Sequence, residues 1–509
     1  MKAEAGRSLF WSGCLSLLAG LAQALSIAVP WNGQPLWWLQ LLSLGVLAWQ
    51  LERSAHGRRA AVLGWVFACA WLTGTFWWMF ISMHTYGGLP APLAAAAVLA
   101  LAAVLALYYA AACALFVRLA PVNRAARALL FGALWLLAEL ARGRWFTGFG
   151  WGGSGYAHVD GPLAGYAPWL GVYGISAVAA WLAMTASQIR TCGLWQRGAA
   201  LAMLVLPWAY QMGGPVMSAS TGRLQVALLQ GDIPQDEKFQ PGSGVPTALR
   251  WYGEQLGANR AALVVAPETA LPLLPQQLPD GYWAALTTRF ASGEQAALIG
   301  MPWGSFSEGY TNAAVGFKPG QANAWRYDKH HLVPFGEFIP TGFKWFTAMM
   351  NIPLGDFNRG GLGQPSFEWQ GQRLAPNICY EDLFGEELGA RFADPATAPT
   401  VFVNLSNIAW FGNTVAIDQH LHISRMRTLE FARPFVRATN TGATAIIDYQ
   451  GRVTAALPRH TRGVLSGEVE GRQGLTPYAW WVSHLGLWPL WGAALLVLGL
   501  VMRRLLSKT

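Results

Sequence analysis

The chain has 509 residues, 53% of them hydrophobic and only 12% charged, which excludes an ordinary soluble domain. The formal net charge of +9 is unevenly distributed. Residues 222–470 hold 19 Lys and Arg against 22 Asp and Glu, while the rest of the chain holds 16 against 4. The net positive charge therefore belongs to the hydrophobic part, which points to membrane topology and anionic lipid headgroups and away from a nucleic-acid surface.

Eight hydrophobic stretches are predicted to cross a membrane, since about 20 apolar residues span a bilayer. They are residues 8–29, 36–51, 61–81, 91–117, 126–141, 165–187, 196–213 and 483–502. The first is not a cleavable signal peptide, because no soluble sequence follows it. We expect a membrane α-helical bundle with seven spans in residues 1–221 and the eighth, followed by a tail, in residues 471–509.

Lysine and arginine are concentrated in alternate loops, which are predicted to be cytoplasmic. Loops 53–59 and 118–127 each carry three, and the tail 503–508 carries three more, whereas loops 30–35 and 82–90 carry none. Both termini are therefore expected in the cytoplasm. The long segment between spans seven and eight is expected outside, in the periplasm, if the membrane is a bacterial inner membrane.

Residues 222–470 carry scattered charges and no apolar run long enough to span a membrane. The pattern predicts an exported α/β domain in which short apolar strands alternate with helices. Expected strands are 224–230, 262–266, 297–301 and 400–405, expected helices are 243–259, 281–291 and 415–432, and a hairpin is expected around 443–448.

Three residues of this domain together have the chemistry of an acyl-carrying nucleophile. They are Glu268 in Val-Val-Ala-Pro-Glu, Lys329 in Tyr-Asp-Lys-His-His, and Cys379 in Asn-Ile-Cys-Tyr-Glu. A thiol with a pKa of about 8.5 needs a base or cation to become the reactive thiolate. Taken singly, each residue is more often structural: a surface acid, a surface lysine or a buried thiol. Cys379 is the only cysteine of the domain, so it has no disulfide partner there.

Two other patterns are given no chemical role. Gly148–Gly153 matches G-x-G-x-x-G, but it lies between two spans and follows no strand, so we expect a flexible loop at the membrane surface. The pairs His330-His331 and His420-Leu-His422 lack the cysteine and acidic spacing of a known zinc site. We expect them to form hydrogen bonds or to pack, and we expect no metal or other cofactor.

The motifs resemble those of the carbon-nitrogen hydrolase, or nitrilase, superfamily. The shared segments are Pro267-Glu268, Lys-His-His-Leu-Val-Pro-Phe-Gly-Glu from 329 to 337, and Asn-Ile-Cys-Tyr-Glu from 377 to 381. The resemblance implies a nitrilase-like α-β-β-α sandwich and a Glu268, Lys329 and Cys379 triad. Glu337 would then hold the lysine, with Tyr380 and Glu381 as supporting residues, although a solvated acid explains Glu381 almost equally well.

With eight spans around this domain, the whole chain is similar to membrane-embedded members of the superfamily that acylate bacterial lipoproteins. The resemblance implies a phospholipid acyl donor, typically phosphatidylethanolamine, and the N-terminal amine of an S-diacylglyceryl-cysteine in an apolipoprotein as acceptor. Glu268 would act as the base, Lys329 would stabilise the oxyanion, and Cys379 would carry the acyl group as a thioester.

Segment 342–357 is unusually apolar for an exported loop, and Gly360, Gly361 and Gly363 follow it. We interpret the segment as a mobile arm over the lipid entrance, with the glycines as hinges. The alternative is an ordinary core helix.

Two other functions stay open at this stage. A membrane-tethered amidase or nitrilase would use the same triad with water as the acceptor. A transporter or assembly scaffold would need charged residues within the spans, where Glu139 is the only well-placed acid.

Overall fold

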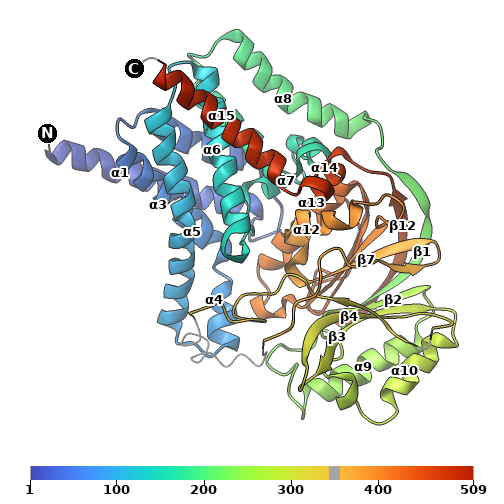
Figure 1. Cartoon of the computed structure of the whole chain (residues 1–509). Helices are drawn as coiled ribbons and strands as arrows, with labels where there is room; N and C mark the ends of the chain where they lie inside the picture. The colour runs from blue at the N-terminus through green and yellow to red at the C-terminus, as the bar shows by residue number, and fades with distance from the viewer. Residues whose placement is uncertain (1, 322, 343–355, 508–509) are drawn as a thin grey trace. The chain divides into compact units, whose positions relative to one another are not determined.

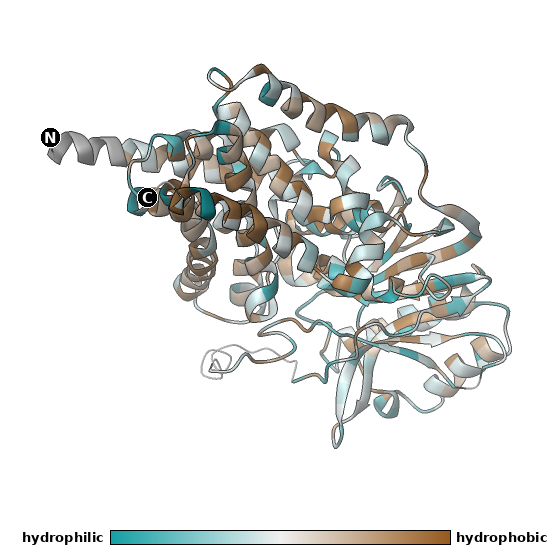
Figure 2. Ribbon diagram, turned by 45° about the horizontal axis from the view of Figure 1, so that its top comes forward, coloured by the Kyte–Doolittle hydropathy of each residue, from teal (hydrophilic) through white to brown (hydrophobic). Residues whose placement is uncertain are grey.

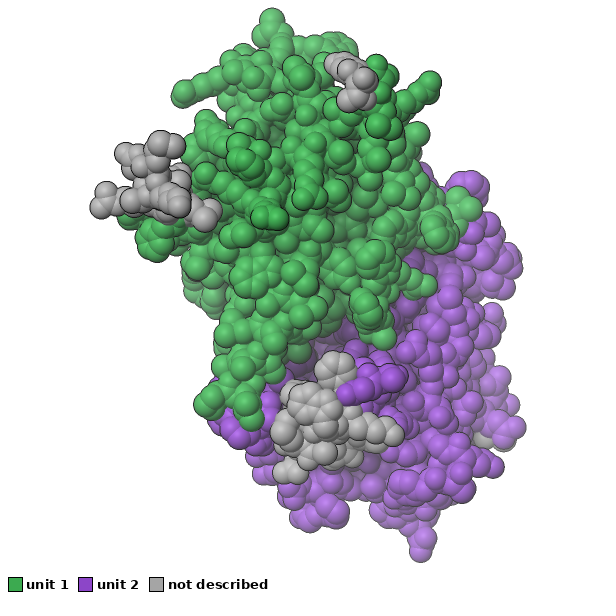
Figure 3. Space-filling view, turned by 60° about the vertical axis from the view of Figure 1, so that its left-hand side comes forward, with its two compact units in different colours: residues 1–79, 92–215, 485–509 green, residues 80–91, 216–484 purple. Residues whose placement is uncertain are grey.

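The computed structural model describes residues 2–321, 323–342 and 356–507. The chain forms two compact units, which Figure 3 colours separately. The helical unit comprises residues 1–79, 92–215 and 485–509, and the α/β unit comprises residues 80–91 and 216–484. Most of the apolar segment 342–357 lies outside the described residues, so its predicted role as an arm stays a prediction.

Eight long helices build the helical unit, and each overlaps one of the expected spans (Figure 1). They are α1 (Lys2–Ile27), α2 (Trp37–Glu52), α3 (Gly57–Phe76), α5 (Ala91–Leu119), α6 (Arg124–Arg144), α7 (Ala167–Ser187), α8 (Leu194–Gly213) and α15 (Trp488–Leu506). Figure 2 shows apolar residues along these helices. Among the described residues, five stretches are long and apolar enough to cross a membrane: Phe10–Ile27, Gly57–Phe76, Ala91–Leu119, Pro162–Ser187 and Trp488–Leu506.

The G-x-G-x-x-G segment is packed within the helical unit, so the prediction of a flexible surface loop is wrong. The Arg142 guanidinium donates to the carbonyls of Phe149 (2.9 Å) and Trp151 (2.8 Å) and pairs with Glu139 at 3.0 Å. Glu139 in turn accepts from the backbone N–H of Ser154 at 3.1 Å. A buried ion pair needs further hydrogen-bond partners, and this loop supplies them. The short helices η2 (Trp145–Thr147), η3 (Ser154–His158) and η4 (Pro162–Tyr166) lead from α6 to α7.

The segment between α3 and α5 belongs to the α/β unit. The third span was expected to continue to residue 81, but α3 ends at Phe76. Helix α4 (Met79–Ile81) and the π-helix η1 (Ser82–Tyr86) follow. The Tyr86 ring meets the Trp410 ring edge to face at 6.0 Å. Trp410 lies in η8 (Ile408–Phe411), so the Tyr86 contact lies within the α/β unit.

Two six-stranded sheets form the centre of the α/β unit. The first has the order β12-β1-β2-β3-β4-β5, with bounds Gly463–Gln473, Ala219–Gln230, Leu263–Ala266, Ala296–Ser305, Gly309–Phe317 and Trp325–Asp328. The second has the order β11-β10-β9-β8-β7-β6, with bounds Val453–Ala456, Ala445–Ile447, Phe435–Thr439, Val401–Ser406, Gln372–Ile378 and Phe367–Trp369. In both sheets three parallel strands (β1, β2, β3 and β7, β8, β9) are flanked by antiparallel ones.

The sheets pack face to face and carry helices on their outer sides (Figure 1). Along β1, Leu224, Val226 and Leu228 enter the core between the sheets, while Ala227 and Leu229 face the helices α9 (Gly244–Ala258) and α10 (Tyr282–Ala291). On the second sheet, Phe431 of α13 (Ala416–Phe431) packs on Phe402 of β8 at 5.5 Å, and α12 (Gly385–Gly389) lies nearby. The layers form the α-β-β-α sandwich that the resemblance implied.

The α/β unit extends further than the expected boundary at residue 470. Strand β12 continues to Gln473, and α14 (Pro477–Leu485) packs through Tyr478 on Phe431 at 5.3 Å. Gly360 is held in place rather than free as a hinge: its N–H donates to the Lys329 carbonyl at 2.8 Å. A Cβ at Gly360 would lie 2.2 Å from the carbonyl oxygen of Asp328, so glycine is required there by close approach.

Leu298→Ala is expected to destabilise the α/β unit. Leu298 is fully buried between the sheets, and truncation of such a leucine costs about 2–5 kcal/mol through lost burial and a residual cavity. Thermal melting of the purified protein in detergent measures the effect. Val453→Ala, at a position 39% exposed on the edge strand β11, is the control and should leave the melting temperature nearly unchanged. Equal melting temperatures for both variants would contradict this account of the core.

Candidate active site

Glu268 lies just beyond the carboxyl end of β2 and is only 7% exposed. One carboxylate oxygen accepts from the Asn312 side-chain amide at 2.7 Å and lies 3.3 Å from Lys329 Nζ. The other accepts from the backbone N–H of Asn407 at 2.9 Å. These three donors hold the Glu268 side chain in one orientation beside Lys329.

Lys329 immediately follows β5 and is completely buried. Its ammonium lies 2.9 Å from the Glu337 carboxylate and 3.3 Å from that of Glu268. Burial alone would lower the pKa of Lys329, but the two carboxylates raise it well above its ordinary value. The lysine is therefore a permanent cation in this site.

Glu337 and Asn312 complete the surroundings of the lysine. The Asn312 amide donates to Glu337 at 2.7 Å as well as to Glu268, so it links the two carboxylates. Glu337 also accepts from the backbone N–H of Val333 at 2.8 Å. These contacts fix both acids on either side of Lys329.

Cys379 directly follows β7, where the 3₁₀ helix η6 (Cys379–Leu383) begins, and its side chain is half-buried. Its φ of 56° lies in the left-handed region, which costs a non-glycine residue free energy. Its carbonyl accepts from the Asn404 side-chain amide at 2.8 Å and lies 3.2 Å from His420 Nε2. Burial raises the pKa of the Cys379 thiol, the Glu268 carboxylate raises it further, and Lys329 only partly offsets this. The resting residue is a thiol that needs a base.

A buried network lies behind the Cys379 main chain. His420 Nε2 lies 2.9 Å from Asp382, and Arg437 pairs with the other Asp382 oxygen at 3.2 Å. A guanidinium cannot accept hydrogen bonds, so His420 Nδ1, 3.0 Å from Arg437, must be the acceptor. The proton is then on Nε2, which points at both Asp382 and the Cys379 carbonyl. Burial lowers the pKa of His420, in keeping with a neutral ring.

The supporting residues Tyr380 and Glu381 bind main-chain groups around the site. The Tyr380 hydroxyl donates to the Leu332 carbonyl at 2.8 Å. Glu381 is 3% exposed and accepts from the backbone N–H groups of His330 (2.7 Å), His331 (3.0 Å) and Ile378 (2.6 Å). Burial raises the pKa of Glu381, although these donors oppose the rise. Glu381 therefore joins the lysine segment to the cysteine segment and is not a solvated acid.

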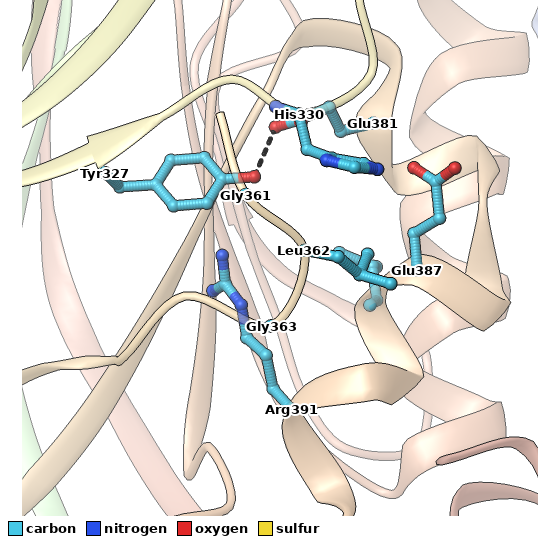
Figure 4. A pocket seen from close by; sticks show the side chains of 9 residues that line it. Tyr327, His330, Gly361, Leu362, Gly363, Glu381, Glu387 and Arg391 are labelled. Atoms are coloured by element: carbon cyan, nitrogen blue, oxygen red, sulfur yellow. Dashed lines mark hydrogen bonds between the residues drawn. The ribbon is translucent and has the colours of Figure 1, made fainter. Parts of the chain in front are cut away.

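Figure 4 shows a small cavity behind Glu381, where the Tyr327 hydroxyl donates to the carboxylate at 2.9 Å. The cavity is lined by Tyr327, His330, Gly361, Leu362, Gly363, Glu381, Glu387, Leu388 and Arg391. None of Glu268, Lys329 or Cys379 lines this cavity, so it is not the space in which a substrate would meet the thiol. The neighbouring His331 is held by Glu387 at 2.9 Å and stacks on Phe384.

The structure brings Glu268, Lys329 and Glu337 into direct contact and sets Cys379 in the same electrostatic environment. Sequence reasoning missed Asn312, Asn407, Lys238 and the roles of Asp382 and Arg437. Asn407 could have been found, because it follows a predicted buried strand at the edge where active-site groups of α/β folds gather. Asn312 and Arg437 lie within strands that were not predicted, so no such signal was available for them.

Two family models match this chain. Residues 19–185 match the apolipoprotein N-acyltransferase N-terminal domain, and residues 225–478 match the carbon-nitrogen hydrolase family.

Full-length relatives carry the same two parts. The chain is 62% identical to apolipoprotein N-acyltransferase of Verminephrobacter eiseniae, over 95% of each chain. It is 47% identical to that of Ralstonia nicotianae, over 91% of this chain and 88% of the relative. It is 37% identical to that of Nitrosomonas europaea, over 92% of this chain and 94% of the relative. Both units are thus matched together in each relative, and the chain belongs to the apolipoprotein N-acyltransferase family.

Proposed function

We propose that this enzyme moves an acyl chain from a phospholipid, through a thioester on Cys379, to the N-terminal amine of S-diacylglyceryl-cysteine in an apolipoprotein. The observation that carries the proposal is the buried Lys329 ammonium, 3.3 Å from the Glu268 carboxylate, with the Cys379 thiol in the same electrostatic environment. Family membership adds the lipoprotein acceptor, which the site alone does not specify. The product is a triacylated lipoprotein.

In the first half-reaction, Glu268 takes the proton of Cys379 and the thiolate attacks the ester carbonyl of the phospholipid. Negative charge develops on the carbonyl oxygen, and Lys329 stabilises it together with backbone N–H groups near Cys379. Glu268 then returns its proton to the departing lysophospholipid oxygen. The acyl group stays on sulfur as a thioester.

In the second half-reaction, the acceptor amine attacks the thioester and Glu268 receives a proton from the nitrogen. Cys379 leaves as a thiolate and takes this proton back from Glu268, which restores both groups to their starting states. An amide is the most resonance-stabilised acyl product of the series, so the sequence from ester to thioester to amide runs downhill without a nucleotide or metal.

Transfer to an amine is favoured over hydrolysis by water because the relatives that match both units bear an acyltransferase name. A membrane-tethered amidase would need the same Cys379 chemistry but no lipid-linked acceptor. Both proposed substrates are lipids, and each buried CH₂ is worth about 0.8 kcal/mol. An enzyme that stays in the membrane can reach them without extracting their chains.

We further propose that all eight helices cross a bacterial inner membrane, with both termini in the cytoplasm and the catalytic domain, residues 222–470, in the periplasm. The eight long helices within residues 1–221 and 471–509 would then form the membrane-embedded parts. Loop 82–90, which lacks Lys and Arg, supports this orientation, because the surrounding segment 80–91 belongs to the α/β unit. The phospholipid donor is proposed to be phosphatidylethanolamine.

Cys379→Ser is expected to abolish acyl transfer, because a hydroxyl is a far poorer nucleophile in a site built to ionise a thiol. The assay follows the mass of a synthetic S-diacylglyceryl-cysteinyl peptide incubated with phosphatidylethanolamine and purified enzyme. Cys14→Ser, in α1 of the helical unit, is the matched control and should transfer normally. A fully active Cys379→Ser enzyme would remove this residue from the mechanism.

Glu268→Gln should slow formation of the acyl-enzyme by about 10²-fold or more. The amide fills the same space and still accepts from Asn407, but it cannot take up the thiol proton. Release of lysophospholipid in a single turnover measures this step. Glu254→Gln, an exposed acid on α9, serves as the control. If Glu268→Gln acylates at the parental rate, another group is the base.

Lys329→Arg should fail nearly as badly as Lys329→Ala, because a broad planar guanidinium cannot replace a compact ammonium held between Glu268 and Glu337. The expected loss of acyl-enzyme formation is about 10²–10³-fold. Binding of a non-reactive ether phospholipid should stay normal in both variants. An active Lys329→Arg enzyme, or one impaired only in lipid binding, would overturn the oxyanion role.

A further inference from the structure

A second lysine, Lys238, is buried beside the same carboxylate and takes no part in the steps above. Its side chain is 2% exposed, and its Nζ donates to the backbone carbonyl of Glu268 at 3.0 Å. The ring of Phe239 lies 5.9 Å from the amine. Burial of a lysine amine is costly, and a surface loop would normally leave such a side chain in water.

The loop that carries Lys238 is fixed to the strand ends that form the site. The Asn440 side chain binds both the N–H (3.0 Å) and the carbonyl (2.8 Å) of Ile233. Gln235 accepts from the Asn407 side chain at 2.9 Å, and the backbone N–H of the same asparagine binds Glu268. The position of the lysine is therefore set by the residues that aim the base.

The charged groups around Cys379 have a net negative charge without Lys238, and a second cation offsets it. Lys329 is already shared by the carboxylates of Glu268 and Glu337. These three groups together carry one net negative charge, and transfer of the Cys379 proton to Glu268 places a negative charge on sulfur without changing that total. Like charges in a buried site oppose ionisation, and an additional nearby cation favours it.

We propose that Lys238 is a positioning and charge-compensating residue: it holds the main chain of Glu268 and, when protonated, offsets the negative charge that forms on Cys379. The inference rests on the proposed function of this site. In both half-reactions the sulfur passes through a thiolate, first as nucleophile and then as leaving group, so both steps gain from the same cation.

The pH dependence of this role follows from the groups that face the amine. Burial lowers the pKa of Lys238 to about 7, while the charges of Glu268 and Cys379 act in the opposite direction. The lysine is thus charged at and below neutral pH and loses its proton as the pH rises. Its effect on Cys379 should be largest near pH 6.5 and should fade towards pH 8.5.

The test is the rate at which iodoacetamide alkylates Cys379, followed by mass spectrometry of the Cys379 peptide at pH 6.5 and pH 8.5. Lys238→Gln removes the charge and keeps a hydrogen-bond donor on a side chain that is one atom shorter. Alkylation should fall about tenfold at pH 6.5, equivalent to one pKa unit, and distinctly less at pH 8.5. Lys238→Arg, charged at both pH values, should restore most of the rate.

Lys318→Gln is the matched control, because Lys318 also donates to a backbone carbonyl, that of Glu368 at 3.0 Å, but on the exposed surface. Its alkylation rate should equal that of the parent. Parental rates for Lys238→Gln at both pH values would overturn the inference. The same fold reduction at both pH values would also overturn it, since it indicates a structural role alone.

Two further outcomes are decisive. If Lys238→Gln does not fold, Lys238→Arg decides: alkylation near the parental rate supports the charge role, and slow alkylation of a folded protein contradicts it. The alkylation assay uses no lipid. If the parent enzyme transfers no acyl chain to the lipopeptide, the proposed function is wrong. The alkylation rates of the parent and the Lys238 variants then still test the effect of Lys238 on Cys379.

Discussion

The buried ammonium of Lys329, held between Glu268 and Glu337, is the interaction on which the active site depends. A cation without water must be paired and hydrogen-bonded, and here two carboxylates and the Asn312 amide provide this. The same contacts keep the Glu268 side chain oriented. The pKa of the Cys379 thiol is raised by burial and by Glu268, so the thiol needs a base to become a nucleophile.

The main chain around Cys379 is held by several contacts. Cys379 has a left-handed φ, which persists only where the surroundings fix it. Asn404 and His420 bind its carbonyl, and His420 is locked in one tautomer by Arg437. The second sheet, helix α13 and the start of η6 all contribute residues around Cys379, so the fold fixes the conformation of its main chain.

Three helices and the strands β1, β2, β3 and β8 of the α/β unit could be predicted from hydrophobic periodicity. Helices 243–259, 281–291 and 415–432 agree with α9, α10 and α13 within one residue at each end. Strands β4, β5, β6, β7, β9 and β12 were not predicted, and in β4, β7 and β9 the polar residues Asn312, Asn377 and Arg437 interrupt the apolar pattern. These residues are buried and hydrogen-bonded to one another or to the site. The interruption is therefore a result of function, which periodicity alone cannot recognise.

The candidate active-site residues also divide into those that the sequence predicted and those that only the structure revealed. Glu268, Lys329 and Cys379 could be named because their residue types and motifs resemble a known family. The second buried lysine, Lys238, lies in a loop with no periodic pattern, and only tertiary contacts bring it to Glu268. The packed loop at 148–153 was misjudged because a glycine-rich sequence gives no sign of the buried Glu139–Arg142 pair that fixes it.

The central claim is that Cys379 carries the acyl chain between two lipids. The most direct measurement is the intact mass of the parent enzyme after incubation with a phospholipid of one defined acyl chain, followed by addition of the diacylglyceryl-cysteinyl peptide. The account predicts a mass gain of one acyl group on the Cys379 peptide, which disappears as the same chain arrives on the peptide amine. Transfer to the peptide with no acyl-enzyme at any time, or an acyl group on another residue, would contradict it.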